Sequence, residues 1–384
     1  MTDLPPPQPI DIGVVKDGAI AFSPWSAATE KPKGALPNPD PPADRVGIAV
    51  VSLGRLSLEQ ILPALNQCKH ARLSALVSGT PDKLARAGEQ YGIPAAHQYS
   101  YDMFDRIAED EAVQAVYIVA PNARHEELVC RAAAAGKHVL CEKPMSVGSA
   151  SARRMIEACR AADRLLMIAY RSRFQPHMRE AIRLAQNGEL GRIKLINALN
   201  LQNQGDPSQW RQQAALAGGG SLPDVGLYCL NIATAFAGEP PADVTALVTT
   251  PPNDPRFATV EDQVSFTLRF NGGPVATCVT GYDAHKLSRL IVSLQDGWIE
   301  LENAFDYVGQ RLRVTRRVGE REQVSEIVMK EENQFMLEID HFAECVLTGQ
   351  APMTPGELGL ADHLAMEAIY QAANDRRPVP VTSA

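Results

Sequence analysis

An aspartate and a tyrosine four positions apart are the first candidates for chemistry in this chain. The segment AGGGSLPDVGLY places Asp224 and Tyr228 on one face of a predicted helix, where a phenol can act as a general acid and base. A structural explanation also exists, because Ser221 and Pro223 are typical of a helix start. Asp224 would then be a capping residue and Tyr228 a core aromatic. The run Gly218–Gly220 favours a functional site, since glycines allow the backbone to approach a ligand closely.

A lysine at the end of a predicted strand is the second candidate. Glu142 and Lys143 follow an apolar run and precede Pro144. Ligands of open parallel sheets bind beyond the carboxyl ends of the strands, which is where this pair would lie. An ammonium there can hydrogen-bond a hydroxyl group and stabilise the anionic form of a neighbouring acid. An ordinary surface ion pair is the alternative, and the position of the pair favours function.

A degenerate dinucleotide-binding turn follows the first predicted strand. Ser52–Ser57 reads SLGRLS, in which only the middle glycine of G-x-G-x-x-G remains. That glycine is the one that lets the backbone approach the pyrophosphate, and the two serines are small enough for the tight turn and the helix packing. The predicted cofactor contacts in this turn are Leu53, Gly54, Arg55 and Leu56.

The end of the second predicted strand indicates the type of cofactor. Enzymes that use NAD usually carry an acidic residue there for the ribose 2′-hydroxyl. This chain has Ser78, Gly79 and Thr80 instead, and Lys83 follows on the next helical turn. A hydroxyl, free amides at a helix N-terminus and a cation suit a 2′-phosphate. The sequence therefore favours NADP, with a plain strand–helix turn as the alternative.

Elements that could position these residues begin at Arg45. Predicted helices alternate with apolar runs of buried-strand length at 46–53, 72–78, 112–120, 137–143 and 164–170. This alternation is typical of a parallel sheet covered on both faces. We therefore predict a Rossmann dinucleotide-binding domain over residues 45–169.

The pattern changes after residue 170 to that of a large, mainly antiparallel open sheet. A helix pattern in FQPHMREAIRLAQNG precedes alternating strands at 192–202, 243–250, 262–270, 274–282, 288–295, 298–302 and 307–316. Two helices, about 333–348 and 356–375, end the chain. The fold class is thus α/β plus α+β, with a substrate-binding and oligomerisation domain over residues 170–384. We expect the open face of the sheet to bury itself in a homodimer or homotetramer.

Residues 1–44 form a third region, a proline-rich arm. Its composition favours an extended segment, and a disordered tail is the plainer interpretation. Phe22 and Trp25 indicate instead that the arm docks on its own domain or on a neighbouring subunit.

Composition argues against several classes of function. The net charge of −8 argues against nucleic-acid binding, and no apolar stretch approaches the roughly 20 residues that span a bilayer. The N-terminus lacks a secretory signal pattern, so a cytoplasmic location is expected, with the periplasm open if a signal has been removed. The seven cysteines form no CxxC pair, which predicts neither disulfides nor a zinc site. No set of cysteine, histidine and aspartate suggests another metal site or a nucleophilic triad.

The order of the motifs resembles that of the glucose–fructose oxidoreductase/inositol dehydrogenase family. The motifs are the dinucleotide turn, VSGT, APNARH, EKP, AYR, QWR, AGGGSLPDVGLY and a late IDHFAEC. They span nearly all of residues 45–380, and EKP with AGGGSLxDxGxY makes the resemblance specific. Many members have histidine where this chain has Tyr228, which is similar to the glucose–fructose oxidoreductase branch. The chain departs from the family at Ser52, where the family has a glycine.

The resemblance implies both an activity and roles for particular residues. The branch binds NADP tightly, uses a serine–lysine 2′-phosphate site, and oxidises one sugar while reducing another. Tyr228 would be the general acid and base, and Lys143 its electrostatic partner. Sugar contacts are expected from Tyr170, Arg171, Asp224, Lys143 and Tyr228. The nicotinamide end is expected to be lined by Pro121, Asn122, Glu142, Lys143, Trp210 and Arg211, with His125 near its ribose.

Three other functions remain open on sequence. One is an ordinary NADP-dependent sugar dehydrogenase whose cofactor exchanges at each turnover. Another is a non-catalytic nucleotide sensor, which would not need Lys143, Asp224 and Tyr228 together. The third is a glycosidase that uses the nicotinamide transiently, which the tyrosine in place of histidine disfavours. His138, His341 and His363 are expected to be structural.

Overall fold

The computed structural model describes residues 14–16, 19–21 and 44–382. Strands β1 (Val14–Lys16) and β2 (Ala19–Ala21) pair as an antiparallel hairpin, a unit separate from the body of the protein. Residues 1–13, 17–18 and 22–43 of the predicted arm, which include Phe22 and Trp25, lie outside the described residues.

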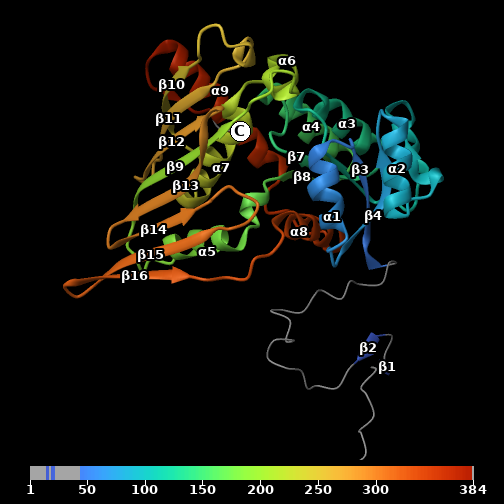
Figure 1. The fold of residues 1–384 in the computed structure, drawn as a ribbon, viewed down its shortest axis with the longest axis horizontal. Coiled ribbons are helices and arrows are strands. Elements are labelled where there is room, and N and C mark those ends of the chain that lie inside the picture. The colour runs from blue at the N-terminus through green and yellow to red at the C-terminus, as the bar shows by residue number, and fades with distance from the viewer. Residues whose placement is uncertain (1–13, 17–18, 22–43, 383–384) are drawn as a thin grey trace, which may run out of the picture. The chain divides into compact units, whose positions relative to one another are not determined.

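The first part of the body is a six-stranded parallel sheet in the order β5-β4-β3-β6-β7-β8, of which Figure 1 labels β3, β4, β7 and β8. Its strands are β3 (Val46–Val51), β4 (Ala71–Val77), β5 (Gln98–Tyr99), β6 (Ala115–Ile118), β7 (His138–Glu142) and β8 (Leu166–Ala169). Alternate residues of β3 pack into two different hydrophobic cores. Ile48 and Val50 belong to one core, and Ala49 and Val51 belong to the other. Apolar side chains on both faces explain why the strands read as continuous apolar runs. The predicted Rossmann sheet is confirmed.

Two groups of helices cover this sheet, one from the same part of the chain as the strands and one from near the C-terminus. The local ones are a π-helical turn (Ser57–Ile61) that continues into α1 (Leu62–Leu65), α2 (Pro81–Tyr91), α3 (His125–Ala134) and α4 (Ser149–Ala161). Helix α8 (Gln334–Thr348) returns from the far end of the chain to pack on α1, β3 and β4 (Figure 1). Helix α9 (Gly356–Asp375) packs on α4 and β8 and also on β10, so it joins the two sheets.

The second sheet has nine strands in the order β16-β15-β14-β13-β9-β12-β11-β10-β17. They are β9 (Ile193–Asn203), β10 (Asp243–Thr249), β11 (Gln263–Arg269), β12 (Val275–Gly281), β13 (Asp283–Leu294), β14 (Gly297–Glu302), β15 (Arg311–Val318), β16 (Arg321–Ile327) and β17 (Val379–Pro380). All neighbours are antiparallel except β12 and β9, so the predicted mainly antiparallel sheet is confirmed. Strand β16 was not expected, because its polar sequence REQVSEI carries no apolar alternation.

One face of this sheet is covered and the other is open. Helices α5 (Pro176–Gln186), α7 (Leu227–Ala237) and α9 pack against the strands. On β11 the alternate residues Val264, Phe266 and Leu268 are buried, while Ser265 and Thr267 between them are only half-buried. The side chain of Leu247 on β10 is 69% exposed. This is the pattern expected of a sheet with one uncovered face.

The predictions on cysteines and membrane spans can be checked directly. All seven cysteines are free thiols. Over residues 14–16, 19–21 and 44–382, no helix is both long and apolar enough to cross a membrane. Across the same residues, no group of three potential metal ligands gathers.

Candidate active site

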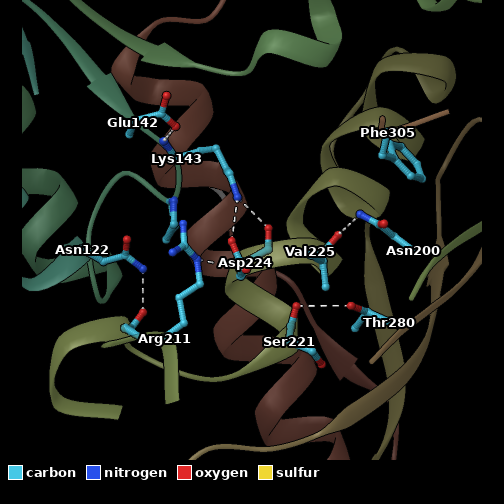
Figure 2. Close-up of polar contacts among 12 residues, drawn as sticks. Asn122, Glu142, Lys143, Asn200, Arg211, Ser221, Asp224, Val225, Thr280 and Phe305 are labelled. Atoms are coloured by element: carbon cyan, nitrogen blue, oxygen red, sulfur yellow. Dashed lines mark hydrogen bonds and ion pairs between the residues drawn. The ribbon is translucent and has the colours of Figure 1, made fainter. Parts of the chain in front are cut away.

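Lys143, at the carboxyl end of β7, is the centre of a buried polar cluster. Its ammonium donates to the backbone oxygen of Asp224 at 2.7 Å and to the Oδ1 atom of that residue at 3.0 Å (Figure 2). The same nitrogen lies 4.5 Å from the ring centroid of Tyr228. The structure thus brings together the three residues predicted to carry the chemistry.

Asp224 is held as a carboxylate by its neighbours. Besides Lys143, its Oδ2 atom accepts a hydrogen bond from the Tyr282 hydroxyl at 2.7 Å and lies 3.3 Å from Nε of Arg211. Burial by itself raises the pKa of Asp224, but the charges of Lys143 and Arg211 and the Tyr282 bond outweigh it. The pKa therefore lies below its usual range.

Tyr228 lies beside two cations. The guanidinium carbon of Arg171 is 4.7 Å from its ring centroid, close to the 4.5 Å of the Lys143 ammonium, and the ring of Phe305 is 6.0 Å away. Burial lowers the pKa of Lys143, yet the charges of Tyr228 and Asp224 more than offset this and raise it above its ordinary value. Lys143 is therefore an ammonium at neutral pH, and its positive charge acts on the phenol ring.

The turn that carries Asp224 differs from the predicted serine-capped helix. Ser221 has helical backbone angles and its side chain makes no capping bond. Residues Leu222–Gly226 form a π-helical turn before α7. Two side chains of the sheet hold this turn, since Asn200 donates to the Val225 oxygen at 2.9 Å and Thr280 to the Ser221 oxygen at 3.2 Å (Figure 2). The π turn, rather than a cap, positions Asp224.

The glycine run next to this turn serves packing rather than ligand approach. A Cβ on Gly220 would lie 2.1 Å from the backbone oxygen of Glu261, and one on Gly219 would lie 2.2 Å from the Tyr370 hydroxyl. The Glu261 carboxylate accepts the amides of Gly220 and Leu222. The expectation that these glycines line a ligand site is therefore corrected.

Two of the expected sugar contacts are used inside the protein. Tyr170 is buried in the core, and burial together with the nearby Asp362 raises its pKa. Its predicted sugar contact is not supported by that position. Arg171 donates to the Phe305 oxygen and to Gln334, both at 2.7 Å. Its charge also acts on Tyr228, which places Arg171 beside the site, and its predicted sugar contact stays a prediction.

The predicted dinucleotide turn keeps the shape that a glycine would allow. Ser52 has a φ of 78°, a left-handed conformation that favours glycine. Its carbonyl accepts the Ser57 hydroxyl at 2.5 Å, and its own hydroxyl pairs with that of Tyr101. A Cβ on Gly54 would meet nothing within 4 Å, so one side of the turn is open. Leu53 is buried, while Arg55 is exposed and pairs with Glu59, and Leu56 is half-buried.

The proposed 2′-phosphate donors lie together after β4. The Ser78 hydroxyl accepts from the Thr80 amide at 3.2 Å, and Gly79 packs against the Tyr101 ring. Lys83 is exposed on the first turn of α2. A hydroxyl, backbone amides and an exposed cation fit the phosphate of NADP.

Three residues expected at the nicotinamide end turn into the protein instead. Both nitrogens of the buried His125 face backbone oxygens, that of Ala120 at 2.8 Å and that of Pro144 at 3.1 Å. Asn122 donates to the Ala217 oxygen at 2.8 Å (Figure 2). Glu142 accepts from the Tyr117 hydroxyl at 2.8 Å. These bonds hold the three side chains in place behind the site, and their predicted cofactor contacts stay predictions.

The remaining predicted residues stay near the cluster. Pro121 is half-buried directly before the turn of Asn122–Arg124. The guanidinium of Arg211 lies 4.4 Å from the Trp210 ring centroid and also pairs with Asp224. His138, His341 and His363, which were expected to be structural, each accept a hydrogen bond from a backbone amide on a ring nitrogen. These bonds fit a structural role.

Several residues of the site were not found from the sequence. Tyr282 binds Asp224 from the end of β12, and the Tyr307 ring lies 4.5 Å from the Arg171 guanidinium. Tyr117 and Glu338 lie behind Glu142. Each is 25 or more positions from its partner in the chain, so no local spacing could reveal it.

Comparison with known proteins agrees with this architecture. Residues 46–170 match an oxidoreductase family with an NAD-binding Rossmann fold, and residues 178–300 match the GFO/IDH/MocA C-terminal domain. The chain is 32% identical over 339 residues to D-xylose 1-dehydrogenase [NADP(+)] of Haloarcula marismortui, covering 87% of this chain and 92% of that one.

Solved structures are also similar. An aldose-aldose oxidoreductase from Caulobacter crescentus, complexed with glycerol, has a TM-score of 0.84 and 46% identity, covering 88% of this chain and 99% of the other. A levoglucosan dehydrogenase with NADH and L-sorbose shares the fold at a TM-score of 0.79 and 21% identity, covering 89% and 100% of the two chains. The chain is an oxidoreductase that belongs to the GFO/IDH/MocA family.

Proposed function

We propose that this protein is an NADP-dependent sugar oxidoreductase that oxidises an aldose at C1 to the lactone. The observation that carries the proposal is the contact of the buried Lys143 ammonium with both Asp224 and the Tyr228 ring. The Ser78 hydroxyl after β4 and the exposed Lys83 on the first turn of α2 support NADP. Relatives named for D-xylose oxidation with NADP(+) and for aldose–aldose oxidoreduction support an aldose as substrate.

NADP, when bound, supplies the acceptor for the hydride that leaves C1. Tyr228 takes the proton of the C1 hydroxyl on its phenolic oxygen. The charges of Lys143 and Arg171, each within 5 Å of the ring centroid, stabilise the negative charge on that oxygen. Asp224 remains ionised and holds Lys143 and Arg211 in place.

In a second half-reaction, the same tyrosine returns the proton. A second sugar carbonyl would bind where the lactone has left. Its carbon would receive the hydride that the reduced cofactor supplies, and Tyr228 would protonate its oxygen to give the alditol. A tightly bound NADP makes this cycle self-contained. The 46% identity to the aldose-aldose oxidoreductase supports it.

The other candidate is an ordinary dehydrogenase with an exchanging cofactor, which the similarity to D-xylose 1-dehydrogenase favours. One experiment separates the two. The protein is purified without added cofactor, an aldose is added, and the near-ultraviolet band of reduced nicotinamide is followed. A stoichiometric band that disappears when a second sugar is added supports the two-sugar cycle. Continuous reduction of free NADP by protein that purifies empty identifies the dehydrogenase.

We also propose that the open face of the large sheet binds a second copy of this chain. Leu195, Leu199 and Ile291 lie on that face near its centre, where the register pairs β9 with β13, and Leu247 lies on the same face of β10. A charge at Leu199, as in Leu199→Asp, should give monomers in a sedimentation experiment. Leu347→Asp, on the exposed end of α8, should leave the oligomer intact. Monomeric wild-type protein would contradict the proposal.

A further inference from the structure

Two buried carboxyl groups share one tyrosine hydroxyl behind the Lys143 turn. The Tyr117 oxygen lies 2.8 Å from Oε1 of Glu142 and 3.3 Å from Oε1 of Glu338. Tyr117 and Glu338 are completely buried, and Glu142 is 8% exposed. Glu338 reaches this place from α8, more than 190 residues after Glu142 in the chain.

The number of protons shared by Tyr117, Glu142 and Glu338 decides which of their contacts can be hydrogen bonds. A tyrosine hydroxyl has one proton, so it can donate to only one of the two carboxyl groups. The other contact is a hydrogen bond only if the second carboxyl carries a proton and donates to the tyrosine oxygen. Two ionised carboxylates that both contact one hydroxyl group in a dry core would also repel each other.

The surroundings show which carboxyl carries the proton. Burial raises the pKa of Glu142, but the bond from Tyr117, the charges of Lys143 and Arg171 and the Lys143 amide, which donates to Oε2 at 3.2 Å, all favour its anion. Oε2 of Glu338 is buried and has no hydrogen-bond partner among the described residues. A partnerless oxygen costs much less on a neutral acid than on a carboxylate. Burial and the charge of Glu142 raise the pKa of Glu338 well above its ordinary value, against the opposing charge of Arg171.

We propose that Glu338 is a positioning residue for the Lys143 turn. As a neutral acid it donates to Tyr117, and this directs the single Tyr117 proton onto Glu142. Glu142 in turn holds the Lys143 amide, and the Lys143 side chain extends from that residue to Asp224 and Tyr228. Gln334, one turn earlier on α8, holds Arg171 beside the same tyrosine, so α8 supports both cations of the site.

The kinetic consequence rests on the proposed function. Glu338→Leu removes the donor, so we expect kcat for NADP-dependent aldose oxidation to fall about 100-fold, as for a small displacement of a catalytic group. The KM for the sugar should change little. Glu338→Gln keeps an N–H donor for Tyr117 and should restore most of kcat. Phe342→Leu, a buried change one turn further along α8, controls for lost packing and should keep kcat at a lowered Tm.

A readout that does not depend on activity separates this inference from the proposed function. The infrared difference spectrum of the NADP-bound wild type minus Glu338→Gln should show the carbonyl band of a protonated carboxyl at neutral pH. Absence of that band means an ionised Glu338 and overturns the proposal, as does unchanged kcat in Glu338→Leu or equal losses in the Leu and Gln variants. If the wild type oxidises no aldose, the proposed function fails and the infrared band alone decides about Glu338.

Discussion

The ammonium of Lys143 lies 4.5 Å from the ring centroid of Tyr228, although 85 positions separate the two residues in the chain. Lys143 directly follows β7 of the Rossmann sheet, and Tyr228 lies in the first turn of α7, which packs on the other sheet. The contact therefore forms only when the two layers are assembled. It places the positive charge of the ammonium beside the phenol that we propose transfers the proton.

Removing the phenolic hydroxyl should abolish proton transfer and leave the cofactor site intact. Tyr228→Phe keeps the ring and its packing against Phe305, so we expect kcat to fall by roughly 10²–10⁴-fold with little change in NADP affinity. Steady-state kinetics and titration with NADP measure the two effects. Near-normal turnover would show that another group carries the proton.

Neutralising the central cation should impair both catalysis and folding. Lys143→Met leaves the buried Asp224 carboxylate with Arg211 and Tyr282 alone. We expect kcat to fall at least about 100-fold, and the free energy of unfolding to fall by about 3 kcal/mol, as when one partner of a buried ion pair is removed. Lys286→Met, at an ion pair whose lysine is 63% exposed, should cost much less. Equal stability losses in the two variants would contradict the assigned role.

Removing one cation at the nucleotide site should change the preference between NADP and NAD. Lys83 is exposed on the first turn of α2, near Ser78 and Gly79. Lys83→Ala should weaken NADP binding about tenfold, because the substitution removes one charge-assisted hydrogen bond to the phosphate. The effect is modest because water competes for an exposed lysine. NAD affinity should stay the same. Parallel losses for both cofactors would place Lys83 away from the 2′-phosphate.

A buried aspartate outside the site should make stability depend on pH. Burial is the main cause that raises the pKa of Asp362 from 3.8 to about 6, although the nearby Tyr170 hydroxyl and the hydrogen bond from Asn231 lower it. The folded state therefore binds the proton more tightly than the unfolded state. The contribution of the protonated Asp362 to the free energy of unfolding is lost as pH rises from about 4 to about 6. Above that range, the full free-energy cost of burying the ionised carboxylate is present.

Asp362→Asn removes this cost and keeps an oxygen acceptor for Asn231. Relative to the wild type, its free energy of unfolding should rise by up to about 3 kcal/mol at pH 8 and very little at pH 4. Denaturant unfolding at the two pH values measures the difference. Asp375→Asn, at the exposed end of the same helix, is the control and should show no such divergence.

Local sequence patterns predicted much of this protein. The Rossmann strands could be identified because both of their faces are buried, which gives apolar runs such as VGIAVV. Lys143, Asp224 and Tyr228 could be proposed because strand ends and i, i+4 pairs have known positions in these elements.

Tertiary structure decided what each side chain faces. Glu142 and Lys143 are neighbours in the chain, yet the side chain of the first contacts Tyr117 and that of the second contacts Asp224. Ser52 could be shown to keep a glycine-like turn only from its backbone angle. Tyr282 and Glu338 join the site through contacts with residues 58 and 221 positions away. Such contacts depend on how the sheets and α8 pack together, and no periodicity within one segment carries that information.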